Sequence, residues 1–354
     1  MSAAAPHRIT ASHRVQYAAL RGGVGALRPL GFHGASAVGG WLGRLGYAPI
    51  GIRRAVVERQ LAAAFPDWTA DRVARTARQS YESLGRTFIE TAVLPSYSAS
   101  QVLDLFERVE NWDTFESARA LGRGVILLTG HIGNWELGGS YLAARGVPLD
   151  AVARSMENPL FDGYLTRTRR RIGMQVVHDV DAVRVVPRSL RSGRAVAFLF
   201  DQGAVGLAST WVPFFGRLAK TPRGPAVFAL RLDSPMVFGA AIRQPNGRFV
   251  LSFEPVATVR TGDREADVDA MVSAYTTVLE RWVRRVPEQY FWHHRRWKHQ
   301  QPGTPPELGD PSCRPVPARR SAPWGAPGSR SSSSRGLLLR RSRRRSWPAT
   351  LRWP

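Results

Sequence analysis

A short apolar run that leads directly into a polar turn is the feature that most constrains the fold. The residues Gly124–Thr129 read GVILLT, which is typical of a strand that is buried on both faces. Similar runs follow at 150–154, 174–177 and 195–200. Helical stretches separate them at 135–145, 159–172 and 181–192. Alternating strands and helices predict an α/β protein, an αβα sandwich with a mostly parallel central sheet.

Further elements are expected on both sides of this alternating region. After a loop, we predict a helix near 222–232, strands near 236–242 and 249–253, and a final helix near 266–285. Before it, we predict a helix over 53–65 and a long helix that Thr69 caps and that runs to about Leu94. Apolar residues recur at intervals of three and four along the long helix, so one of its faces should be buried.

The N-terminal region, residues 1–50, is rich in Ala, Gly and Leu, but Arg21, Arg28 and Arg44 interrupt it. A charge at mid-bilayer costs about 2.5–3.5 kcal/mol, so a single spanning helix is disfavoured. Two short helices around Pro29 that lie in the membrane interface fit better. An amphipathic hairpin packed on the domain remains an open alternative. No signal peptide is evident in these first residues.

The net charge of +23 is unevenly distributed along the chain. Residues 299–354 hold eleven arginines against Glu307 and Asp310, which leaves 23 − 9 = +14 for the rest. We expect this Pro-, Ser- and Arg-rich segment to be a disordered tail after a folded domain over 51–298. The basic body suits nucleic acid, anionic lipid or an acidic carrier protein. The single cysteine, Cys313, excludes a disulfide or a cysteine-based zinc site in the body.

The strand at 125–128 leads into His131-Ile132-Gly133-Asn134-Trp135-Glu136. Residues five apart on a continuous helix lie about 140° apart, so His131 and Glu136 meet only if the segment begins as a turn. Gly133 permits such a turn. Glu136 would then fix the imidazole tautomer, and His131 would act as a general base on an alcohol that attacks a thioester or ester. A structural histidine at a strand end is the alternative.

The segment resembles the H-x4-D/E motif of the glycerolipid acyltransferases, and its HxGNWE form is similar to the lipid A secondary (lauroyl/myristoyl) acyltransferase family. Further blocks of that family follow in order: Arg154 with 157–160, 200–202, 212–216 with 220–221, and 287–298. The resemblance covers about residues 53–298. Five ordered blocks are specific, whereas HxxxxE alone is weak.

The resemblance implies a glycerolipid-acyltransferase-like fold with His131 as the base and Glu136 as its orienting carboxylate. Backbone N–H groups near Gly133, or Arg154, would stabilise the oxyanion. It further implies substrate-binding roles for these residues: Gly133, Asn134, Arg154, Asn158, Asp201, Gln202, Lys220, Glu288, His294 and Arg295. No metal and no cofactor are expected beyond the donor substrate, acyl carrier protein or coenzyme A carrying the acyl chain.

The function that this resemblance implies is transfer of a fatty acyl chain from acyl carrier protein to a hydroxyl of a lipid A precursor. The expected location is the cytoplasmic face of a cell inner membrane, with acyl carrier protein, the glycolipid acceptor and an anionic membrane surface as partners. Acylation of a phosphatidylinositol mannoside or an ornithine lipid is the nearest alternative. A nucleic-acid-binding protein is a rival of another class, but the basic residues follow no recognisable binding module, so no nucleic acid is expected.

Overall fold

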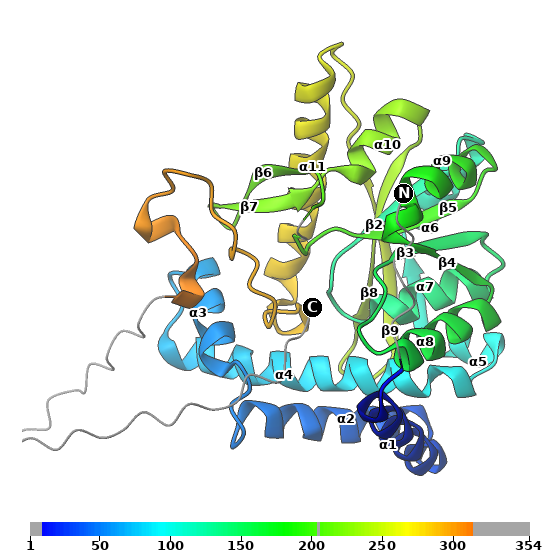
Figure 1. The fold of residues 1–354 in the computed structure, drawn as a ribbon, viewed down its shortest axis with the longest axis vertical. Coiled ribbons are helices and arrows are strands. Elements are labelled where there is room, and N and C mark those ends of the chain that lie inside the picture. Colours follow the sequence, from blue (N-terminus) through cyan, green and yellow to red (C-terminus); the bar gives the residue numbers. More distant parts are fainter. Residues whose placement is uncertain (1–8, 204–205, 314–354) are drawn as a thin grey trace, which may run out of the picture. The chain divides into compact units, whose positions relative to one another are not determined.

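The computed structural model describes residues 9–203 and 206–313, and its centre is a seven-stranded sheet in the order β1-β9-β8-β2-β5-β3-β4 (Figure 1). The strands are β1 (Phe106–Glu110), β2 (Val125–Thr129), β3 (Leu149–Ala153), β4 (Met174–His178), β5 (Ala195–Leu199), β8 (Met236–Arg243) and β9 (Phe249–Val256). All neighbouring strands pair in parallel except β8 and β9, which are antiparallel. The mostly parallel sheet predicted from the sequence is therefore confirmed.

The two faces of the sheet support two separate hydrophobic cores. Along β2, Ile126 and Leu128 face one core, whereas Val125 and Leu127 face the other. Helices α9 (Ala182–Arg191), α10 (Gly224–Leu232) and α11 (Arg264–Arg285) contribute side chains to the first core. Helices α5 (Ala99–Asp104), α6 (Trp112–Ala120) and α7 (Trp135–Ala144) contribute to the second, and α8 (Pro159–Arg171) packs along β4. This is the predicted αβα sandwich.

Three strands were not predicted from the sequence. The edge strand β1 has the sequence FERVE, which carries little apolar signal. The others, β6 (Ser209–Phe214) and β7 (Arg217–Pro222), form an antiparallel hairpin outside the main sheet. The hairpin turn places both Phe215 and Gly216 at positive φ, as a two-residue hairpin turn requires.

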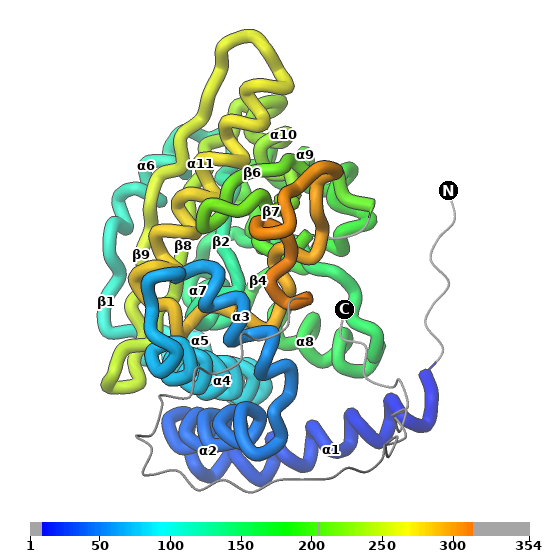
Figure 2. The backbone as a smooth tube through the Cα atoms, turned by 90° about the vertical axis from the view of Figure 1, so that its left-hand side faces the viewer, coloured from blue at the N-terminus to red at the C-terminus, as the bar shows by residue number. Residues whose placement is uncertain are grey.

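The long helix α4 (Ala70–Val93) is covered by α2 (Gly31–Tyr47), and both views place the two helices side by side (Figures 1 and 2). Their contact depends on glycine. A Cβ added at Gly43 would lie 2.0 Å from the backbone oxygen of Tyr81, and one at Gly85 would lie 2.2 Å from that of Gly39. Only residues without a side chain allow two helix backbones to approach so closely.

The N-terminal helices separate at Pro29, as predicted: α1 (Ala11–Leu27) ends there and α2 follows a short 3-10 turn. Six residues of α2 are buried, whereas α1 buries none. Helix α2 therefore packs on the domain, as in the alternative of an amphipathic hairpin, and only its outer face is exposed. Among the described residues, no helix has the length and apolar character needed to cross a membrane.

The folded body continues beyond Lys298, where the sequence predicted the start of a disordered tail. Asp310 accepts a hydrogen bond from Arg295 at 3.1 Å, and the carbonyl oxygen of Ser312 accepts one from Arg59 at 2.7 Å. These bonds attach residues 299–313 to the domain, which corrects the predicted boundary. The remaining part of the predicted tail, residues 314–354, lies outside the described residues. Helix α3 (Arg54–Ala64) supplies Arg59.

Candidate active site

The register between β2 and β5 places His131 next to Asp201. Thr129, the last residue of β2, pairs with Leu199, the last residue of β5. His131 and Asp201 each follow their strand by two residues, at the same edge of the sheet. The carboxyl ends of parallel strands commonly form ligand sites in open α/β sheets.

Asp201 holds His131 by two hydrogen bonds. The imidazole Nδ1 lies 2.7 Å from Oδ1 of Asp201, and the backbone N–H of His131 donates to Oδ2 at 3.0 Å. Burial alone would raise the pKa of Asp201, but the charge and hydrogen bonds of His131, together with the charge of Arg296, lower it to about 2. The carboxylate is therefore ionised at neutral pH, and it leaves Nε2 as the imidazole nitrogen available to a substrate.

Glu136 does not contact His131, contrary to the pairing inferred from the motif. It is instead paired with Arg169 of α8, whose Nε donates to Oε2 of Glu136 at 3.0 Å. The reason is geometric: α7 begins at Trp135, so Glu136 already lies on the first helical turn and faces α8. The carboxylate that orients the imidazole comes from the neighbouring strand.

The turn after His131 is held by the backbone. Gly133 has φ +60°, and a Cβ there would lie 2.0 Å from the carbonyl oxygen of Ala241 in β8. Its N–H donates to the carbonyl oxygen of Gln289 at 2.9 Å, and the N–H of Asn134 donates to that of Ala241 at 2.9 Å. The N–H of Gly133 itself is thus bound to a protein carbonyl, and the role expected for N–H groups near Gly133 or for Arg154 at an oxyanion stays a prediction.

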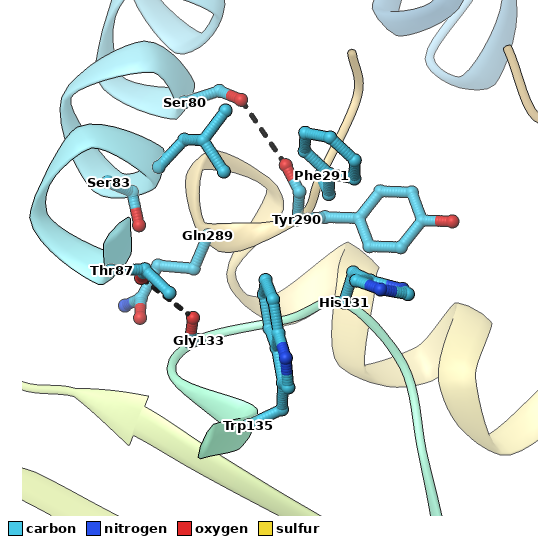
Figure 3. A pocket seen from close by; sticks show the side chains of 10 residues that line it. Ser80, Ser83, Thr87, His131, Gly133, Trp135, Gln289, Tyr290 and Phe291 are labelled. Atoms are coloured by element: carbon cyan, nitrogen blue, oxygen red, sulfur yellow. Dashed lines mark hydrogen bonds between the residues drawn. The ribbon is translucent and has the colours of Figure 1, made fainter. Parts of the chain in front are cut away.

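A small cleft opens beside His131 (Figure 3). Ser80, Ser83 and Thr87 of α4 line one side, and residues 289–291 line another. The cleft is narrow, with a volume of about 10 Å³. The ring of Trp135 lies edge-on to the imidazole of His131 with centroids 4.7 Å apart, so the imidazole is packed on that side as well.

Three of the predicted substrate-binding side chains are engaged within the protein. Asn134 is 1% exposed and caps α7 by accepting from the N–H of Leu137. Asn158 is also buried, and it caps α8 and donates to the carbonyl oxygen of His13 in α1. Arg295 is paired with Asp310. These contacts give each of the three a structural role, and their binding of substrate stays a prediction.

Two further predicted residues, Arg154 and Lys220, belong to a basic rim that also includes Lys298. Arg154 is exposed and has no carboxylate partner among the described residues. Burial and the nearby charges of Arg295, Arg154 and Arg53 lower the pKa of Lys298. Lys220 is half-buried, and it lies near His299, whose pKa is lowered by burial and by the charges of Lys298 and Lys220.

The other three predicted residues carry no positive charge at neutral pH. Burial lowers the pKa of His294 to about 3 and raises that of Glu288. Gln202 directly follows Asp201 and is partly exposed. A neutral His294 cannot pair electrostatically with an anion at neutral pH.

Two functional neighbours were missed from the sequence. Tyr290 is fully enclosed, and burial and the negative charge of Asp201 raise its pKa well above the usual value. Arg296 is 4% exposed, donates to the carbonyl oxygen of Lys220 at 2.7 Å and helps to keep Asp201 ionised. The cluster of Arg295, Arg296 and Lys298 beside aromatic residues indicated a functional segment in the sequence. Nothing in that pattern predicted that Arg296 is the buried member.

A His–Asp pair at the carboxyl ends of parallel strands, with one imidazole nitrogen free, is typical of an enzyme that uses general-base catalysis. Within the described residues, no group of three or more His, Cys, Asp or Glu side chains is arranged to hold a metal ion. Residues 7–299 match the bacterial lipid A biosynthesis acyltransferases, and the chain belongs to that family. It is an acyltransferase.

Individual relatives agree with this assignment. A lipid A biosynthesis palmitoleoyltransferase of Escherichia coli is 26% identical over 247 residues, which cover 70% of this chain and 79% of the relative. A lipid A biosynthesis lauroyltransferase of the same organism is 26% identical over 267 residues, covering 75% and 85%. A phosphatidylinositol mannoside acyltransferase of Mycobacterium tuberculosis is 26% identical over 163 residues, covering 45% and 51%.

Proposed function

We propose that this enzyme transfers a fatty acyl chain from a thioester donor to a hydroxyl of a glycolipid, with His131 as the general base. The observation that carries the proposal is the 2.7 Å contact between Nδ1 of His131 and the buried Asp201. Because Asp201 engages Nδ1, Nε2 is left to accept a proton from the acceptor hydroxyl. Asp201 replaces Glu136 as the orienting carboxylate in this proposal.

The chemistry needs one proton to move twice. Nε2 of His131 accepts the proton of the acceptor hydroxyl while its oxygen attacks the thioester carbonyl carbon. The C–S bond then breaks, the ester remains on the acceptor, and the imidazolium returns the proton to the departing thiolate. Asp201 stabilises the imidazolium between these two steps, as a buried carboxylate does in related His–Asp pairs.

The acceptor that we favour is a phosphorylated lipid A precursor. Two relatives act on lipid A by name, and their alignments cover more of the chain than that of the phosphatidylinositol mannoside acyltransferase. The basic rim of Arg154 and Lys298 suits an acceptor that carries phosphate. An acidic acyl carrier protein is the donor that best complements a chain with net charge +23.

We further propose that the enzyme lies on the cytoplasmic face of an inner membrane through its N-terminal helices. Trp41 and Leu42, on the outer side of α2, are 53% and 46% exposed, and Leu30 is 53% exposed. No Asp or Glu precedes Glu58 in the sequence, so the charged side chains that α1 and α2 themselves contribute are cations. Exposed apolar groups among cations are what an anionic bilayer surface binds.

The direct test is acyl transfer by the purified enzyme, using an acyl carrier protein thioester and a lipid A precursor in mixed micelles. H131A should lose nearly all acyl transfer while keeping the thermal midpoint of the wild type. H33A is the matched control, because His33 is an exposed histidine on α2, outside the site. Near-normal transfer by H131A would contradict the mechanism.

The acceptor is tested separately by lipid mass spectrometry. Deleting the gene should remove one acyl chain from lipid A, and the wild-type copy should restore it. Unchanged lipid A together with an altered phosphatidylinositol mannoside or ornithine lipid would assign the enzyme to that acceptor instead.

A further inference from the structure

A buried carboxylate lies directly behind the active-site turn and contacts no solvent. Glu90 of α4 is 1% exposed. Its Oε1 accepts from Ser36 Oγ at 2.6 Å and from Arg243 Nε at 3.0 Å. Its Oε2 accepts from Asn134 Nδ2 at 2.8 Å and from Arg243 Nη2 at 2.5 Å. Four accepted hydrogen bonds fill the capacity of a carboxylate, so Glu90 has none left for a substrate.

The partner of this carboxylate joins three parts of the site. Arg243 is the last residue of β8, and its guanidinium also donates to Ser83 and Thr87 of α4 at 3.3 and 3.2 Å. Its backbone exchanges two hydrogen bonds with the side chain of Gln289, at 3.0 and 2.9 Å. Gln289 in turn accepts the N–H of Gly133, so the ion pair connects α4, β8 and the C-terminal segment to the turn.

Asn134 transmits this arrangement to the base. Its Oδ1 caps the first turn of α7, and its Nδ2 is bound by Glu90. A carboxylate accepts but does not donate, so Glu90 dictates which end of the amide faces α7. The turn that carries His131 is therefore held by Asp201 at one end and, through Asn134, by Glu90 at the other.

We infer that Glu90 is a positioning residue for proton transfer at His131. This inference rests on the proposed function, in which His131 is the base. Loss of the charged acceptor leaves Arg243 buried without its partner and releases the amide of Asn134. A displacement of about 1 Å at a reacting group can cost about 100-fold in rate, whereas substrate affinity depends on other contacts.

The experiment compares E90Q with a matched variant elsewhere in the sheet. Asp150 is also 1% exposed and is paired with Arg194, but it lies near the start of β3, at the opposite edge from His131. D150N therefore removes an equally buried carboxylate from an ion pair without touching the turn. Both variants should lower the thermal midpoint. Only E90Q should lower kcat, by about 100-fold, with KM for donor and acceptor within about threefold.

Equal kcat in E90Q and D150N would overturn the inference and leave Glu90 as an ordinary structural residue. If E90Q does not fold, R243K decides: lysine keeps the charge but lacks the planar fork that spans both oxygens of Glu90. R243K should show the same selective loss of kcat, and a kcat equal to that of D150N would overturn the inference as well.

The two variants distinguish failure of the proposed function from failure of this inference. An active H131A would contradict the proposed mechanism, whatever the kcat of E90Q. An inactive H131A together with an E90Q that matches D150N removes only the role of Glu90.

Discussion

Replacing Asp201 by asparagine tests which carboxylate orients His131. The structure places Asp201 beside the imidazole, whereas the motif suggested Glu136. D201N keeps the shape of the side chain and removes its charge. It leaves the imidazolium that forms during proton transfer without a countercharge in a buried position. We expect a large loss of kcat/KM and a folded protein.

The magnitude follows from the pKa of Asp201, which the site lowers from 3.8 to about 2. At about 1.36 kcal/mol per pKa unit, this lowering corresponds to about 2 kcal/mol, or on the order of 30-fold in an equilibrium. Burial raises the pKa of the same carboxyl, so the attraction to His131 and Arg296 exceeds this net value. We expect the loss of kcat/KM in D201N to be on the order of 30-fold or more. Because the pKa of Asp201 is depressed, the contribution is present at neutral pH and is lost only as the pH falls toward about 2.

The assay is the same acyl transfer reaction, with E136Q measured beside D201N. Glu136 is paired with Arg169 and has no bond to His131, so E136Q should lower the thermal midpoint and reduce kcat/KM far less than D201N does. The reverse order would refute the reasoning: D201N near wild type with E136Q inactive would make Glu136 the orienting carboxylate.

Three further predictions concern stability. Burial lowers the pKa of His293 to about 3, so below pH 6.5 the imidazole binds a proton in the unfolded chain but not in the folded protein. Between pH 7 and pH 5, the free energy of unfolding of the wild type should therefore fall by about 2 kcal/mol more than that of H293Q, as measured by urea unfolding. G133A should lower the free energy of unfolding by more than about 3 kcal/mol, because its Cβ would meet a backbone oxygen of β8. In the same measurement, G122A should lower it by about 1 kcal/mol, because Gly122 is also at positive φ but lies in open space. Truncation after Lys298 should lower the thermal midpoint relative to truncation after Cys313, and equal midpoints would return the domain boundary to Lys298.

Elements with a strong local pattern could be predicted from the sequence. The long helix begins after Thr69, as predicted, because Thr69 accepts from the N–H of Arg72. The expected strand at 124–129 is observed as β2, since a continuous apolar run is the signal of a strand buried on both faces.

Two contacts between segments far apart in the sequence could not be predicted from local patterns. Helix α2 packs on α4 through glycines that give no hydrophobic signal, and residues 299–313 are attached by single ionic and backbone hydrogen bonds. Neither kind of contact leaves a periodic pattern. Composition alone made the second segment resemble a disordered tail.

The His131–Asp201 pair shows why a motif can locate a site while its spacing suggests a contact that the fold does not make. His131 and Glu136 are close in sequence, so the spacing suggested a partnership that needed only a turn. In the sheet, β5 lies between β2 and β3, although β3 and β4 separate it from β2 along the chain. This insertion makes β2 and β5 neighbours, and their register then places Asp201 beside His131. Glu136, on the first turn of α7, binds Arg169 of α8 instead. This ion pair connects the two helices and does not contact the imidazole of His131.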